Sequence, residues 1–68
     1  MAPDKMIRMG NQIAEFFRTQ PGIDPAAKTL EHIIDFWEPR MRQQLCDYVA
    51  EGGSGLDAEV IKAAQMMA

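Results

Sequence analysis

Apolar residues recur every three or four positions along most of the chain, and prolines and a glycine cluster divide this pattern into four segments. Such spacing places the apolar side chains of a segment on one face of a helix. No segment alternates between apolar and polar residues for long, and β-branched residues are few, so we expect no strands. The pattern predicts an all-α fold in which residues 1–68 form a single domain, a small bundle of three to four short helices.

Start and stop signals bound the predicted helices. Asp4, Asp24 and Asp57 are expected to act as N-caps. Gly52 and Gly53 are expected to end the third helix with a left-handed glycine cap. The predicted helices cover about residues 4–20, 25–37, 39–51 and 57–64, and the tail 65–68 is expected to fray. Their expected apolar faces consist of Met6, Met9, Ile13, Phe16, Phe17 and Gln20 in the first helix, Ala26, Leu30, Ile33, Ile34 and Trp37 in the second, Met41, Leu45, Tyr48 and Val49 in the third, and Val60, Ile61 and Ala64 in the fourth.

The short length of the chain limits the core that it can bury. A domain of this size hides only about 60 % of the surface of its unfolded chain, and small domains usually gain stability from disulfides, a metal or a partner. The single cysteine, Cys46, excludes an internal disulfide, and the single histidine, His32, has no Cys or His partner at the spacing of metal ligands. A protein partner remains, so we expect the isolated chain to be marginally stable or self-associated.

The charge balance excludes several classes of partner. Seven basic residues stand against ten acidic ones, which gives a net charge of −3. Nucleic-acid binders need clustered Lys and Arg to replace the counterions around phosphates, so no nucleic acid is expected. No apolar run approaches the roughly 18 residues of a membrane span, and the N-terminus lacks the features of a signal peptide, so no membrane is expected either. One unpaired thiol is typical of the reducing cytoplasm, where we expect the protein to be located.

No residue pattern indicates catalysis or a cofactor in this chain. Cys46 has no base beside it and flanks the apolar face, so we expect a small core residue. His32 lies off the apolar stripe and is expected at the surface or an interface. The glycines at 52–55 have no strand before them and no lysine after them, so they indicate a turn between helices. The carboxylates on the polar sides of the helices are expected to be solvated: Asp35, Glu38 and Asp47.

Two adjacent aromatic pairs, Phe16-Phe17 and Phe36-Trp37, indicate an interface with a partner. Neighbours on a helix point about 100° apart, so a narrow core takes one member of each pair and the other only partly. At least one large aromatic side chain should then be exposed, and such surface is typical of protein interfaces. The alternative is a core wide enough to absorb both members of each pair.

The corner between the second and third helices could belong to the same interface. Arg40 and Arg42 lie in the first turn of the third helix, where the helix dipole disfavours cations. They either pair locally with Asp35 or Glu38, or reach carboxylates on a partner. Trp37 is the expected anchor, although it could instead be a plain core residue. The hypothetical partner interface consists of Phe16, Phe17, Phe36, Trp37, Pro39, Arg40 and Arg42.

Three stretches carry a resemblance to a known family. Residues 6–14 (MIRMGNQIA) followed by Phe16-Phe17, residues 36–42 (FWEPRMR) and residues 52–57 (GGSGLD) stand in this order along nearly the whole chain. Together they resemble the delta subunit of soluble NAD-dependent formate dehydrogenases. Gly10 departs from the alanine that the resemblance leads us to expect, which raises a question about the straightness of the first helix.

The resemblance implies a role in a larger complex that oxidises formate to carbon dioxide with NAD⁺. It implies a catalytic alpha subunit with a molybdenum or tungsten bis-pterin centre and iron–sulfur clusters, and beta and gamma subunits with the flavin (FMN), the NAD site and further clusters. The delta subunit would be a non-catalytic accessory subunit without a cofactor, which supports the assembly, stability or cofactor maturation of the alpha subunit. The alternative is a free-standing helical chaperone or adaptor that binds an immature redox enzyme and leaves. A helix-turn-helix regulator is disfavoured because it needs a basic recognition helix.

Overall fold

Four helices account for most of residues 1–67, the part of the chain that the computed structural model describes. They are α1 (Pro3–Arg18), α2 (Pro25–Phe36), α3 (Pro39–Ala50) and α4 (Ala58–Met67), and no strand occurs within this part. The predicted all-α bundle is therefore confirmed.

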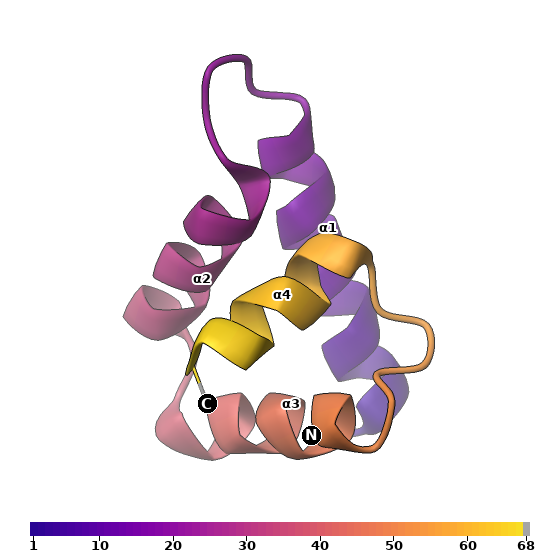
Figure 1. Cartoon of the computed structure of the whole chain (residues 1–68). Helices are drawn as coiled ribbons and strands as arrows, with labels where there is room; N and C mark the ends of the chain where they lie inside the picture. The colour runs from indigo at the N-terminus through magenta and orange to yellow at the C-terminus, as the bar shows by residue number, and fades with distance from the viewer. Residues whose placement is uncertain (68) are drawn as a thin grey trace.

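The helices α1 and α2 run side by side in opposite directions, as Figure 1 shows. The helix α3 lies across the open end of this pair, and α4 crosses one face of it (Figure 1). The contact between α2 and α4 is the most extensive in the bundle. The N-terminal residue lies against α3, because the Gln44 side-chain amide donates a hydrogen bond of 2.6 Å to the Met1 carbonyl oxygen.

Proline begins three of the four helices, and this decides where they start. Asp24 caps α2 as predicted, because its Oδ1 accepts a hydrogen bond of 3.0 Å from the Ala26 amide. The prediction of Asp4 as the N-cap of α1 is wrong. Pro3 already occupies the first helical position, where its fixed φ favours the helix and its missing N–H costs nothing, so Asp4 lies within the first turn.

The helix ends differ from the prediction at α1 and agree with it at α3. The last residue of α1 is Arg18, because the Thr19 hydroxyl donates to the Phe16 carbonyl oxygen at 2.7 Å and the chain then turns. At the end of α3, the Gly53 amide donates to Tyr48 O at 3.0 Å and the Gly52 amide donates to Val49 O at 2.9 Å. These two bonds form a Schellman motif with both glycines at positive φ, so the predicted glycine cap is confirmed.

The tail of the chain is more ordered than expected. The helix α4 extends to Met67, whose side chain packs against the core, so the expected fraying is wrong for residues 65–67. Ala68 lies outside the described residues. The core itself receives side chains from all four helices and from the loop before α4: Met6, Ala14, Ile33, Trp37, Leu45, Leu56, Val60 and Ala64.

The helix α1 is fastened to the loop before α4 by one asparagine. The Asn11 side chain donates to Gly55 O at 2.9 Å and accepts from the Asp57 amide at 2.8 Å, so both ends of its amide are used. The residue before it, Gly10, is buried against Val60. A Cβ at Gly10 would lie 3.2 Å from Val60 Cγ1, so the glycine permits a close approach of α1 and α4 without interrupting α1.

An ion-pair cluster holds the end of α1 to the start of α4. Arg18 Nη2 lies 2.6 Å from Asp57 Oδ2, and Arg18 Nε lies 3.1 Å from Glu59 Oε2. The hydrogen bond to Asp57, together with the charge of Glu59, raises the pKa of the Arg18 guanidinium above its ordinary value. The Asp57 carboxylate thus supplies negative charge at the N-terminus of α4, which agrees with the interpretation of the glycine segment as a turn between helices.

Candidate partner interface

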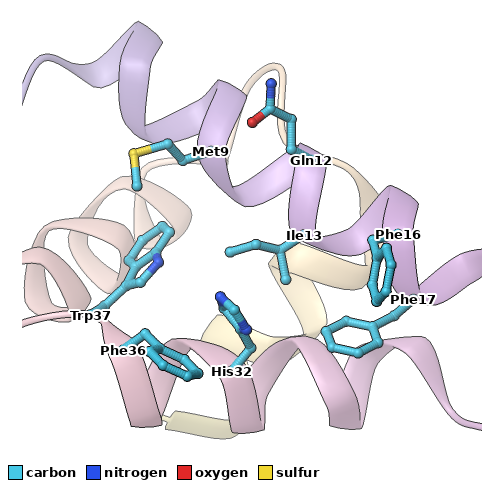
Figure 2. A pocket seen from close by; sticks show the side chains of 8 residues that line it. All are labelled: Met9, Gln12, Ile13, Phe16, Phe17, His32, Phe36 and Trp37. Atoms are coloured by element: carbon cyan, nitrogen blue, oxygen red, sulfur yellow. The ribbon is translucent and has the colours of Figure 1, made fainter.

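A groove with a mainly apolar lining lies between α1 and α2. Its volume is about 560 Å³. In the view of Figure 2 the groove faces the reader and α4 passes behind the two helices, so the groove lies on the side that the bundle leaves uncovered. Eight side chains line it: Met9, Gln12, Ile13, Phe16, Phe17, His32, Phe36 and Trp37.

A row of four rings crosses the groove from α1 to α2. Phe16 meets Phe17 edge to face, with the ring centroids 5.3 Å apart. Phe17 lies 6.3 Å from His32, and His32 lies 4.7 Å from Phe36. Edge-to-face and tilted arrangements are those that aromatic rings prefer, so the row holds the two helices together. The row also presents its two end rings to solvent, since Phe16 is 60 % exposed and Phe36 is 73 % exposed.

Each aromatic pair has one exposed member and one more buried member. Phe17 is half-buried and Trp37 is only 5 % exposed, whereas their neighbours Phe16 and Phe36 point out. The prediction that at least one large aromatic side chain is exposed is confirmed. Of the two roles predicted for Trp37, its burial favours that of a core residue, although Trp37 also contributes to the wall of the groove.

The two arginines of the corner have different environments. Arg42 Nη1 donates to Ile34 O at 3.1 Å and to Trp37 O at 3.0 Å. The Arg42 cation therefore lies over the carbonyl end of α2, where the helix dipole favours it, and neither of the two roles predicted for it describes this contact. Arg40 and Pro39 are exposed, and no ion pair found within residues 1–67 includes Arg40. Arg40 borders a second hollow, of about 570 Å³, which Met1 also lines and which lies outside the lining of the groove.

Half of the groove lining was not among the predicted interface residues. Met9 and Ile13 were assigned to the core, because their spacing continues the apolar face of α1. Gln12 was not singled out, and His32 was expected at the surface or an interface without a specific place. The spacing of Met9, Gln12, Ile13 and Phe16 (i, i+3, i+4, i+7) is the signal that could have located the wall of the groove.

Within residues 1–67, no three His, Cys, Asp or Glu side chains come together as a metal site. Cys46 is half-buried, and its Sγ lies 3.8 Å from Ala64 O. No helix in the same range has the length and hydropathy needed to cross a membrane.

A comparison with protein families decides the identity of the chain. The family model described as the NADH-dependent formate dehydrogenase delta subunit, FdsD, matches residues 5–64. The chain belongs to the FdsD family. The resemblance that the sequence carries is thereby confirmed, over all of α2 and α3 and most of α1 and α4. Searches of curated proteins and of solved structures gave no match.

The structure gives many of the landmark residues of this FdsD chain a role inside the fold. Asn11 binds the loop before α4, Arg42 binds the carbonyl end of α2, and Gly53 forms the cap of α3. Phe16 and Phe36 stand in the same landmark stretches, yet most of their surface remains in solvent. The fold itself does not account for the exposure of these two rings.

Proposed function

We propose that this FdsD chain is a non-catalytic delta subunit that binds the catalytic alpha subunit of an NAD-dependent formate dehydrogenase through the groove between α1 and α2. The exposure of Phe16 and Phe36 on either side of a groove that the bundle leaves open is the observation that carries this proposal. Exposed aromatic surface of this kind is typical of protein interfaces.

The energetic incentive for such binding is large for so small a chain. A phenylalanine carries roughly 200 Å² of surface, and Phe36 exposes 73 % of its surface. At about 25 cal/mol per Å², burying that surface favours association by up to about 3–4 kcal/mol before entropic costs. Phe16, at 60 % exposure, adds a similar amount. Phe16 and Phe36 therefore expose enough apolar surface to contribute strongly to binding.

The proposed role of the subunit is support of the alpha subunit during assembly, cofactor maturation or later stability. The bis-pterin centre with molybdenum or tungsten, the iron–sulfur clusters, FMN and NAD are expected on the other subunits. This chain has one cysteine and one histidine, whereas a cluster of the common type needs four thiolate ligands. The proposal includes the cytoplasmic location expected from the single free thiol and the presence of beta and gamma subunits in the same complex.

Co-expression of the tagged chain with the other subunits tests this proposal. We expect the delta chain to be retained at a fixed ratio in the purified, active complex. We expect its omission to lower the molybdenum or tungsten content per alpha subunit, or the half-life of formate oxidation. A chain that binds only metal-free alpha subunit and is missing from the mature complex would instead be the free-standing chaperone. Full metal content, activity and half-life without the chain, and no retention, would contradict both readings.

A further inference from the structure

We infer that the groove receives one amphipathic helix of the partner subunit, which lies along α1 and α2 and inserts an apolar stripe between Phe16 and Phe36. This inference rests on the proposed function and adds the structural class of the occupant.

The backbone of the groove walls indicates that the occupant is a helix. Both walls are α-helices, α1 and α2, whose interior amides and carbonyls are already bonded along each helix. Of the eight lining side chains, only Gln12, His32 and the Trp37 indole carry polar atoms. An extended segment in the groove would bury N–H and C=O groups that find no partners there, which is costly. A helix satisfies its own backbone, so it can bury one face here without that cost.

The exposed area argues against a second copy of this chain as the occupant. The exposed parts of Phe16 and Phe36 amount to about 270 Å², from roughly 200 Å² per ring and the exposures of 60 % and 73 %. This is about a third of the roughly 800 Å² that each partner contributes to a standard interface. Two copies that met through this groove alone would form a weak dimer. A helix that belongs to a larger subunit brings further contacts beside the groove.

The charges beside the groove indicate what flanks the apolar stripe of the occupant. Lys5 precedes Met9 by one turn, and Arg8 precedes Gln12 by one turn, so both cations border the groove at the end nearest Met9. Both are exposed, and neither belongs to an ion pair found within residues 1–67. Asp4, one turn before Arg8 on α1, is the nearest acidic residue by helical position and offsets only one of the two charges. An acidic residue on the α1 side of the occupant would therefore complement this end of the groove.

The distance between two lining residues on α1 can distinguish a helical occupant from an extended one. Met9 and Phe16 both line it and are seven residues apart on α1, which is a rise of about 10 Å. Along a bound helix, 10 Å again corresponds to about seven residues. Along an extended segment, it corresponds to about three.

The experiment uses the intact complex with a photo-crosslinking amino acid at position 9, at position 16, or at position 34 as the control. Ile34 is 50 % exposed but does not line the groove. We expect positions 9 and 16 to crosslink to one segment of one partner subunit, at residues about seven apart, and position 34 not to reach that segment. The inference is overturned by partner residues about three apart, by two unrelated segments, by a crosslink to a second delta chain, or by no crosslink from positions 9 and 16. Partner residues about three apart, or two segments of the alpha subunit, leave the proposed function standing, because the groove is still bound by that subunit. A crosslink only to a second delta chain, no crosslink from positions 9 and 16, or loss of co-purification without any substitution would contradict the proposed function itself.

Discussion

Thr29 offers a sharp test of the packing between α2 and its neighbours, because it is a buried hydroxyl without a visible partner. Its side chain is fully buried, at 0 % exposure, and Oγ1 has no hydrogen-bond partner within residues 1–67. An unpaired buried hydroxyl costs about 1–3 kcal/mol relative to a paired one. Valine has the same branched shape, so Thr29→Val replaces the hydroxyl by a methyl group without changing the backbone preference.

We expect Thr29→Val to raise the free energy of unfolding by about 1 kcal/mol, the lower end of that range, because the substitution removes a hydroxyl that loses its hydrogen bonds to water on folding. For a domain of this size, 1 kcal/mol corresponds to a rise in Tm of about 4–8 °C. Urea denaturation followed by circular dichroism at 222 nm measures the effect, and an unchanged m-value shows that the unfolded state has not changed.

Thr19→Val is the matched control, since the Thr19 hydroxyl is exposed and donates to Phe16 O at 2.7 Å. Removing that bond should lower the free energy of unfolding by roughly 0.5–1 kcal/mol, the opposite sign. If Thr29→Val is neutral or destabilising at an unchanged m-value, the Thr29 hydroxyl is satisfied in solution, and the account of a dry, unpaired group at this position is refuted.

Three further predictions concern the loop, the ion-pair cluster and the groove. A left-handed conformation costs an alanine about 1–2 kcal/mol. Gly53→Ala should destabilise the chain by more than this, because the new Cβ would also lie 3.3 Å from an isoleucine side chain. Gly22→Ala is the control in the same melts, since Gly22 has a similar positive φ but nothing within 4 Å. Arg18→Gln should lower Tm at low salt and lose most of this effect at 1 M salt, because its ion pairs with two acidic side chains are partly exposed and screened; a salt-independent loss would show that the stem of Arg18 matters rather than its charge. Phe36→Ser should release the chain from the complex without loss of helicity, whereas Ile34→Ser on the same helix should not; equal release by both would contradict a specific groove.

The periodicity of the sequence predicted the four helices because each has a clear apolar stripe and strong stop signals. It could not show which side of α2 would be left uncovered, since that depends on where α4 lies across the bundle. The position of Trp37 has a local cause. Trp37 follows the last residue of α2 with φ −87° and ψ 139°, so its side chain no longer follows the 100° step of the helix and turns into the core.

The hydrogen bonds of Arg42 could not be predicted from the sequence either, because they cross the corner between two helices. Its hydrogen bonds reach back five and eight residues, to Trp37 and Ile34, across the corner at Pro39. Such contacts depend on the angle between α2 and α3, which spacing along a single helix does not encode. This also separates the two arginines experimentally, since Arg40→Glu changes only an exposed charge, whereas a change at Arg42 disturbs the corner itself.

The exposed rings of the groove have a consequence for the fate of the chain before it meets a partner. A free copy displays Phe16 and Phe36 to solvent on a fold with a small core, and the quality-control chaperones and proteases of a cell act on such marginal, apolar surfaces. Binding would hide the same rings and stabilise the fold by mass action. Orphan copies would then be cleared while assembled ones persist, so the abundance of this chain would follow the abundance of its partner without a dedicated regulator.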